Sequence, residues 1–350
     1  MGLRTKAGAA VFAALFLGSP AGAAPLRIAT FAPDLSRDGP GLLLRDIGKG
    51  DAQVQAVAAV IAEARPDILL LTDVDWDHDG KALAALLQVL RAAGADFPHH
   101  FTARPNAGMA TGLDLDGDGR LGSPDDAQGY GEFSGQGGLV LLSRHPIGPV
   151  IDHSGFLWRD LPGNRMPPLP QQAQAVRRLS STSHWDAVVQ VNGQPLHLLA
   201  MSASPPVFGR RAGLNRARNH DELAFWRQHL PQAPFVLLGN LNVDPQDGDG
   251  DRAALHDLMA QVTDPQPRSA GGTAAGASGL NAGQKGDPAL DTGDWDDQTG
   301  PGNLRADYLL PRKGLTIRGA GVLWPSEGPL AQTVLAASRH RLVWVDLDWP

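Results

Sequence analysis

The sequence predicts an α/β protein with many strands, and three observations support this fold class. Short apolar runs rich in Val, Leu and Ile alternate along the chain with segments whose apolar residues recur at helical spacing. Hydrophobic residues make up 42% of the 350 residues, which is enough for a sizeable core. The 42 Gly and 28 Pro residues predict long and numerous loops between these elements.

Residues 1–24 have the pattern of a secretory signal that precedes this fold. Arg4 and Lys6 form a charged start, and the apolar run that follows, residues 9–17, is too short to span a membrane as a mature anchor. Small residues at 21–23 match a cleavage site, and an uncleaved anchor is the alternative. No other apolar stretch is long enough to span a bilayer, so we expect a secreted or periplasmic protein with no membrane partner. Cys is absent, which excludes a disulfide framework, a thiolate nucleophile and a Cys-type zinc site.

The first elements follow from apolar spacing. Leu26 to Phe31 reads as a short strand. Val54, Val57 and Ile61 recur at helical spacing and predict an amphipathic helix over residues 51–64, which Pro66 ends. Residues 67–72 form an apolar run typical of a buried strand.

The later elements are predicted by the same signals. Helices are expected at 81–93, 219–230 and 253–261, and strands at 138–143, 187–191, 196–200, 235–238, 308–310 and 342–346. Asn192-Gly193 between two of these strands predicts a tight hairpin. Residues 269–298, rich in Gly, Ala and Asp, are expected to form a long loop.

The strand at 235–238 runs into Gly239-Asn240-Leu241-Asn242. Many metal-dependent phosphoesterases carry Gly-Asp-x-Asn at such a strand end, where the Asp activates or positions the attacking water. Asn240 cannot accept a proton in this role. Two other chemistries lack support, because no Gly-x-Ser-x-Gly elbow and no Gly-Lys-Ser/Thr phosphate loop occurs.

Several phrases, in this order and spacing, resemble the endonuclease/exonuclease/phosphatase superfamily and its secreted bacterial branch. They lie at 66–71, 111–120, 142–147, 183–186, 205–208, 219–222, 303–308 and 340–345. The resemblance implies one domain over residues 25–350, folded as a four-layer sandwich of two mixed β-sheets with outer helices. It also implies hydrolysis of a phosphate-containing small molecule or diester with Mg²⁺ or Mn²⁺. The net charge of −7 makes nucleic acid a less favoured substrate.

Site residues carried over from the resemblance are only partly present. Ala32 stands where the family has an Asn near the metal, and Asp73 where it has a metal-binding Glu. Ser202 stands in place of a phosphate-contacting His, and Arg339 in place of an Asp that faces the metal. With Asn240, these substitutions disfavour a metal at the site. The alternating Asp73, Asp75, Asp77 and Asp79 offer a second set of metal ligands. The alternative is a solvated loop whose aspartates cap the next helix.

Three functional positions match the family. Asn242 matches a phosphate-orienting Asn, and a turn residue at a strand end is its alternative. His340 matches the His that meets the scissile phosphate, and a structural His is the alternative. Asp307 matches the carboxylate that fixes the tautomer of this His, although a plain salt bridge is equally compatible with the sequence.

Arg339 suggests how the site is altered. A guanidinium stays charged at any relevant pH, so at this position it repels a metal ion. We hypothesise that Arg339 replaces the metal and forms an anion site with His340, to which the segment 209–211 contributes. Two functions therefore remain open: an impaired or altered phosphoester hydrolase, and a non-catalytic anion-binding or scaffold protein.

A second metal signal lies in residues 114–125. Asp114, Asp116 and Asp118 occupy positions 1, 3 and 5 of a calcium loop, Gly119 occupies position 6, and Asp125 occupies position 12. The flanking segments lack the helices of an EF-hand, so we expect a structural Ca²⁺ bound by the loop alone. The alternative is a polar surface loop built from Asp-Gly turns.

Overall fold

The computed structural model describes residues 25–209 and 213–350 and contains two mixed β-sheets. The first has the strand order β12-β13-β1-β2-β4-β3. Its strands are Leu26–Phe31 (β1), Ile68–Val74 (β2), His99–Thr102 (β3), Gly138–Ser143 (β4), Ile317–Val322 (β12) and Val343–Leu347 (β13). Strands β1 and β2 are parallel, and their neighbours in this sheet are antiparallel.

The second sheet has the strand order β11-β8-β7-β6-β5. Its strands are Ile147–Asp152 (β5), His184–Val191 (β6), Gln194–Ser202 (β7), Phe235–Asn240 (β8) and Asp307–Pro311 (β11). Here β7 and β8 are the parallel pair. A short separate ribbon joins Gly293–Asp294 (β9) to Asn303–Leu304 (β10).

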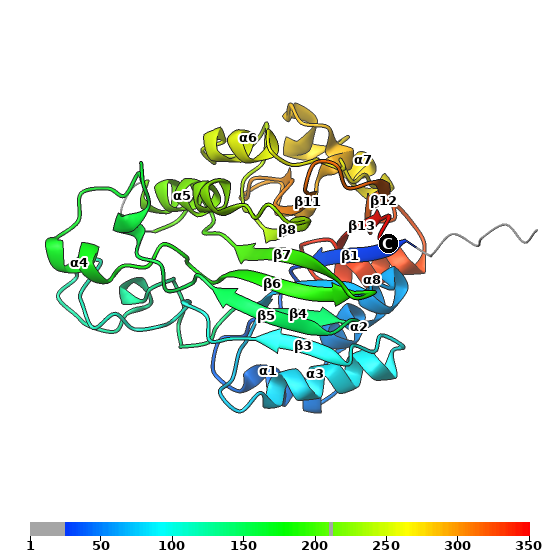
Figure 1. The fold of residues 1–350 in the computed structure, drawn as a ribbon, viewed down its shortest axis with the longest axis horizontal. Coiled ribbons are helices and arrows are strands. Elements are labelled where there is room, and N and C mark those ends of the chain that lie inside the picture. The colour runs from blue at the N-terminus through cyan, green and yellow to red at the C-terminus, as the bar shows by residue number, and fades with distance from the viewer. Residues whose placement is uncertain (1–24, 210–212) are drawn as a thin grey trace, which may run out of the picture.

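Helices cover both outer faces of the paired sheets (Figure 1). They are Leu42–Gly48 (α1), Ala52–Ala64 (α2), Lys81–Ala92 (α3), Gln171–Val176 (α4), Leu214–His229 (α5), Ala253–Met259 (α6), Ala270–Ala275 (α7) and Pro329–Ala337 (α8). The described residues contain no helix that combines the length and the apolar character needed to cross a bilayer.

The strands sort their side chains between layers by alternation. In β2, Leu69 and Leu71 pack into the core beneath α1, α2, α3 and α8, whereas Ile68 and Leu70 enter the core between the two sheets. A third core joins the other face of the second sheet to α5 and α6. The predicted four-layer α/β/β/α sandwich of two mixed sheets with outer helices is therefore confirmed.

Local sequence explains where helices begin and end. Helix α2 begins after Asp51, whose carboxylate accepts hydrogen bonds from the backbone N–H groups of Gln53 and Val54. It ends at Arg65, which adopts a left-handed backbone before Pro66. The N-cap of α3 is Gly80, and the carboxylate of Asp77 in the preceding loop accepts hydrogen bonds from the N–H groups of Lys81 and Ala82, as the capping-loop alternative predicted.

Some sequence predictions were wrong. Residues 269–298 are not one long loop, because the Ser269 hydroxyl caps helix α7 and strand β9 follows. Helix α5 begins at Leu214, five residues earlier than expected. Strands β3, β5 and β12 and helices α1, α4 and α8 were not predicted. The three strands are short and largely half-exposed, so they lack the apolar run that marks a buried strand.

One buried histidine makes the fold sensitive to acid. His184 in β6 stacks on Trp226, with 5.6 Å between ring centroids, and its Nε2 lies 3.2 Å from the Glu222 carbonyl oxygen. Burial lowers the pKa of His184 to about 3, so the folded protein keeps the ring neutral where the unfolded chain binds a proton.

We therefore expect stability to fall as the pH drops below the unfolded pKa of about 6.5. His184 alone lowers the free energy of unfolding by about 2 kcal/mol between about pH 6.5 and pH 5. Denaturant titrations at both pH values measure this effect. The variant His184→Phe keeps an aromatic ring and removes the proton site, so its pH dependence should be weaker; an equal dependence would contradict the assignment.

Candidate functional site

The C-terminal ends of four strands meet at one edge of the sandwich. Strands β1 and β2 end there in the first sheet, and β7 and β8 end there in the second. Register places Ser202 opposite Asn240 and Asn240 opposite Asp307. Ligand sites of α/β sheets commonly lie outside the carboxyl ends of strands.

A glycine permits the close approach of two strands at this edge. Gly239, with φ of 131°, lies in β8 one residue before Asn240. A Cβ atom at this position would overlap the Met201 carbonyl oxygen of β7. The glycine is therefore needed to bring the ends of β7 and β8 together.

These strand ends open into a cleft of about 920 Å³. The predicted site residues that line it are Ala32, Asp73, Ser202, Asn240, Asn242, Arg339 and His340. Asp307 lies directly behind them and is fully buried. The structure thus brings together residues from six separate segments of the sequence.

His340 and Asp307 form a hydrogen-bonded pair. Nδ1 of His340 lies 2.7 Å from Oδ2 of Asp307. Thr292 supports the carboxylate: its hydroxyl donates to the same Oδ2 at 2.9 Å and accepts from the backbone N–H of Asp307 at 3.0 Å. Burial alone lowers the pKa of His340, but Asp307 opposes this by its charge and its hydrogen bond, and the net result is a raised pKa. The ring therefore carries positive charge more readily than a free histidine.

Trp295 packs against the imidazole ring of His340. Its indole meets His340 edge-on, with 5.1 Å between the ring centroids and 84° between the planes. Thr292 and Trp295 come from the segment expected to be a loop, and the sequence carries no motif that singles them out.

Asn240 completes the buried part of the site. Its Nδ2 donates to Oδ1 of Asp307 at 3.2 Å, and its Oδ1 is buried without a hydrogen-bond partner among the described residues. An unpartnered buried acceptor is uncommon in folded proteins. The amide is therefore used to satisfy Asp307, and it supplies no proton acceptor of carboxylate strength.

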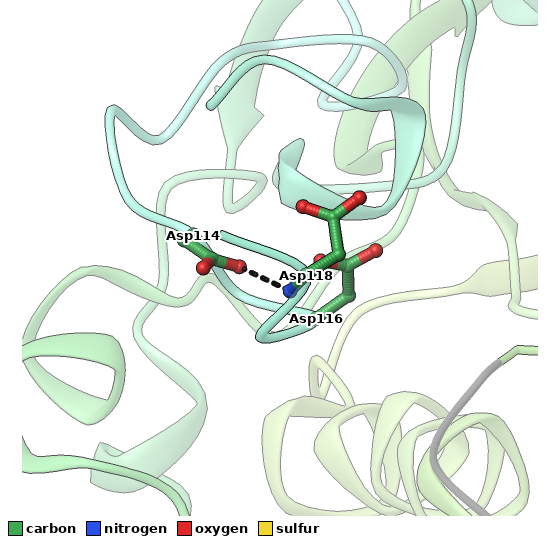
Figure 2. A group of neighbouring side chains, drawn as sticks. All are labelled: Asp114, Asp116 and Asp118. Atoms are coloured by element: carbon green, nitrogen blue, oxygen red, sulfur yellow. Dashed lines mark hydrogen bonds between the residues drawn. The ribbon is translucent and has the colours of Figure 1, made fainter. Parts of the chain in front are cut away.

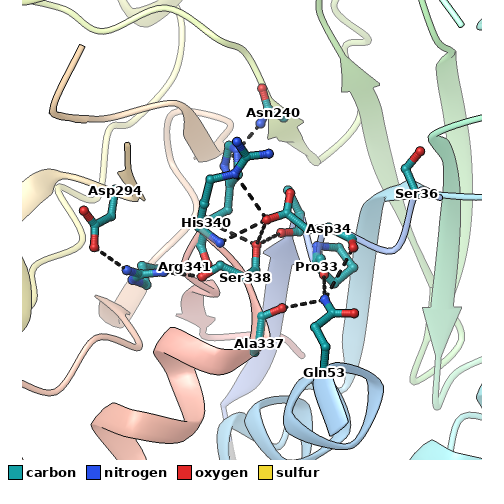
Figure 3. Close-up of polar contacts among 12 residues, drawn as sticks. Pro33, Asp34, Ser36, Gln53, Asn240, Asp294, Ala337, Ser338, His340 and Arg341 are labelled. Atoms are coloured by element: carbon teal, nitrogen blue, oxygen red, sulfur yellow. Dashed lines mark hydrogen bonds and ion pairs between the residues drawn. The ribbon is translucent and has the colours of Figure 1, made fainter. Parts of the chain in front are cut away.

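Asp34 holds the segment that carries Arg339 and His340, and sequence reasoning missed it. Its Oδ2 accepts a hydrogen bond from the backbone N–H of Arg339 at 3.0 Å and lies 3.1 Å from the Ser338 hydroxyl. The Arg339 Nε lies 3.5 Å from the same oxygen. Figure 3 shows Asp34 beside Ser338 and His340, with Asn240 beyond the imidazole. Only the position of Asp34, two residues after Ala32 at a strand end, hinted at this role.

Asp73 is the second carboxylate of the cleft. It has φ of 56° and is partly buried. Burial raises its pKa to about 6, the charge of Asp34 adds to this, and the charges of His340 and Arg339 oppose it. Asp73 is thus a weakly compensated carboxylate that faces the cations of the site.

Asn242 and Ser202 occupy the cleft wall. Asn242 has φ of 53°, and its Nδ2 donates to the Ala203 carbonyl oxygen at 2.7 Å. This hydrogen bond fixes the turn after β8. Ser202 ends β7 and is partly buried. The segment 209–211 was expected to contribute cations, but its Arg210 and Arg211 lie outside the described residues.

The cleft residues do not fit a divalent metal. Among the described residues, the cleft brings no three carboxylate or imidazole ligand atoms within 4.8 Å of one another. Asp34 is occupied by Ser338 and Arg339, and the guanidinium beside it would repel a cation.

A group of three carboxylates in the 114–125 loop, of which Asp116 also lines the cleft, fits a cation better. Asp114, Asp116 and Asp118 bring one ligand atom each within 4.8 Å of the others, and Figure 2 shows them around one turn of the loop. The Asp114 carboxylate accepts hydrogen bonds from the N–H groups of residues 117, 118 and 119. Asp125 is not in this group. The neighbouring Asp126 reaches the loop instead, through a hydrogen bond from the Leu115 N–H at 2.6 Å.

Comparisons with known proteins agree with this architecture. The profile of the Endonuclease/Exonuclease/phosphatase family matches residues 41–340. An endonuclease/exonuclease/phosphatase from Beutenbergia cavernae DSM 12333 superposes with a TM-score of 0.56 at 21% identity, over 93% of this chain and 71% of that chain. A family protein from Leptotrichia buccalis C-1013-b gives 0.54 at 14% identity, over 93% of this chain and 100% of that chain. At these identities the structures show a shared fold alone. No curated protein sequence matches.

Proposed function

Because the chain belongs to the endonuclease/exonuclease/phosphatase family, we propose that its cleft binds the phosphate group of a small ester or diester without a divalent metal and with little or no hydrolysis. One observation carries the proposal. Arg339, anchored on Asp34, stands beside His340 in the cleft where three ligands for a metal do not assemble. A guanidinium and an imidazolium are together suited to a phosphate oxygen.

Substitution of the family positions supports the lack of hydrolysis. Ala32, Asp73, Ser202, Asn240 and Arg339 occupy the positions at which the family resemblance places Asn, Glu, His, Asp and Asp. Loss of one preorganised donor typically costs about 2.7–4 kcal/mol of transition-state stabilisation. Effects within one site do not add, but loss of the base and the metal ligands together removes both the nucleophile and the charge that stabilises the transition state.

Two cations of the cleft support a phosphate ligand. The side chain of Arg339 is 63% exposed, so its guanidinium remains available to a ligand while Nε stays near Asp34. The raised pKa of His340 favours the charged imidazolium, a second donor of positive charge. The carboxylates of Asp307, Asp34 and Asp73 face His340 and hold positive charge on its ring.

A weak phosphoester hydrolase is the second candidate. Asp307 holds His340, and Thr292 in turn holds Asp307. A chain of two such contacts is typical of an oriented functional histidine. A rate of bis-nitrophenyl phosphate hydrolysis with Mn²⁺ that disappears in His340→Ala would favour this candidate over a binding protein.

Calorimetric titration with inorganic phosphate tests the first candidate. Arg339→Ala removes a charge-assisted contact, so the affinity should fall on the order of 10-fold. Arg318→Ala is the matched control, because Arg318 is similarly exposed but pairs with Asp348 at the far end of the chain. Equal phosphate affinity of the wild type and Arg339→Ala would contradict the proposal.

The same proposal includes a signal segment, a single domain and a Ca²⁺ loop. We propose that residues 1–24, which lie outside the described residues, are a signal that directs a single domain of residues 25–350 to the periplasm or the medium. The loop with Asp114, Asp116 and Asp118 is proposed to bind a structural Ca²⁺, and three carboxylates within reach of one ion support this.

A further inference from the structure

We infer that the ligand of the cleft is a phosphoester with a flat or apolar second part, and that Phe208 and Tyr130 bind this part. The inference rests on the proposed function, because it takes the phosphate to lie at Arg339 and His340. It adds the chemical class of the group that the phosphate carries.

Phe208 has an unusual environment for a large aromatic residue. It lines the cleft, and 81% of its surface is exposed. Its φ of 66° lies in the left-handed region, which bulky L-residues rarely adopt. Strained backbone that displays an apolar side chain is typical of binding sites, where the surroundings hold the residue in place.

The segment that carries Phe208 is anchored on both sides of its prolines. Pro205 and Pro206 restrict the backbone, and the Val207 carbonyl accepts a hydrogen bond from the Asn215 side chain at 3.1 Å. Ser204 is fixed from helix α5: its N–H donates to Glu222 at 2.7 Å, and its carbonyl accepts from Asn219 at 2.8 Å. The anchors hold this segment in place while the aromatic ring remains exposed at the cleft, which is a preorganised contact for a ligand.

Tyr130 adds a second aromatic surface to the same cleft. Its side chain is also largely exposed, and its hydroxyl lies 3.1 Å from a Glu132 carboxylate oxygen. Of the six large apolar residues that are exposed in the described part of the chain, these two line the cleft. The cleft volume of about 920 Å³ also far exceeds that of a phosphate ion and matches clefts that bind drug-sized ligands.

The charges of the cleft limit the number of phosphates on the ligand. The aspartates that line it are Asp34, Asp73, Asp116, Asp125, Asp244, Asp247 and Asp249. Of the lining arginines that the structure describes, Arg177, Arg218 and Arg305 are buried, and Arg339 is exposed. A strand with many phosphates would meet more negative than positive charge. The ligand class is therefore a single phosphoester with a flat or apolar group, rather than a nucleic acid.

Paired titrations with phenyl phosphate and glycerol 1-phosphate test the inference on the whole protein. The two ligands carry the same phosphomonoester and differ in the apolar group. We expect phenyl phosphate to bind on the order of 10-fold more tightly. Phe208→Ala should remove most of this difference, and Tyr130→Ala should reduce it. Ile151→Ala is the matched control, since Ile151 is an exposed apolar residue on β5 outside the cleft.

The outcomes separate this inference from the proposed function. Equal binding of the two esters, with both still dependent on Arg339, overturns the inference and leaves the proposed function intact. Binding of neither ester nor inorganic phosphate overturns the proposed function. A preference for phenyl phosphate that survives in both Phe208→Ala and Tyr130→Ala overturns the assignment of these residues, and tighter binding of a single-stranded oligonucleotide overturns the charge argument.

Discussion

If the proposed family residues are restored at five positions, Mn²⁺-dependent hydrolysis of bis-nitrophenyl phosphate is expected to rise by at least about 10³-fold over the wild type. The changes in this variant are Ala32→Asn, Asp73→Glu, Ser202→His, Asn240→Asp and Arg339→Asp. They return metal ligands, a phosphate-contacting imidazole and a carboxylate that can position water. Removal of Arg339 also removes the cation that competes with the metal.

The geometry of the site is the physical reason for this expected gain. Position 240 is opposite Asp307 in the register of β8 and β11, and positions 32, 73, 202 and 339 line the same cleft. His340 already has its supporting carboxylate in place. Adding His340→Ala to the restored variant should abolish the gain, which identifies the cleft as its source. A folded variant that binds Mn²⁺ but shows no increase would contradict the idea that the ancestral site was lost through these substitutions.

Glu222→Ala is expected to give the largest loss of stability, about 3 kcal/mol or more. The fully buried carboxylate accepts hydrogen bonds from the Ser181 N–H at 2.6 Å, the Ser181 hydroxyl at 2.7 Å and the Ser204 N–H at 2.7 Å. It also faces the buried guanidinium of Arg218. Removal of the Glu222 carboxylate leaves the donors of Ser181 and Ser204 without an acceptor, and it leaves the Arg218 guanidinium without its facing negative charge.

Thermal unfolding measures the effect of this substitution. A loss of this size should lower the melting temperature of a chain of 350 residues by roughly 4 °C. The matched control is Glu63→Ala, an exposed glutamate on α2, which should change stability by no more than about 0.5 kcal/mol. Ser181 and Ser204 both line the cleft. Glu222→Ala should therefore weaken phosphate binding as well as lower stability. A melting temperature within the range of the control would show that the network contributes little.

Much of the fold could be predicted from the sequence because its central strands are strongly patterned. Residues 26–31, 68–74, 138–143 and 235–240 are apolar runs bounded by Pro, Gly or polar residues, and each forms a strand close to its expected limits. The site positions at the ends of these strands could be predicted for the same reason. Polar residues that follow buried strands converge once the strands pair.

The rest of the site depends on contacts between distant segments. Asp34 acts through the backbone of Arg339, 305 residues later, and Thr292 supports Asp307 from a segment without a sequence signal. The exposure of Phe208 and its left-handed backbone are properties of the folded loop. Edge strands such as β3 were missed because half-exposed strands carry a mixed polar pattern.

The most direct test of a metal-free phosphate site is the affinity for inorganic phosphate measured twice, once with EDTA and once with excess Mg²⁺. If the Arg339 guanidinium takes the place of a metal ion, the affinity for phosphate should be the same in both solutions. The variant Arg339→Ala should lose this affinity. Phosphate binding that requires Mg²⁺, or that persists unchanged in Arg339→Ala, would contradict this account.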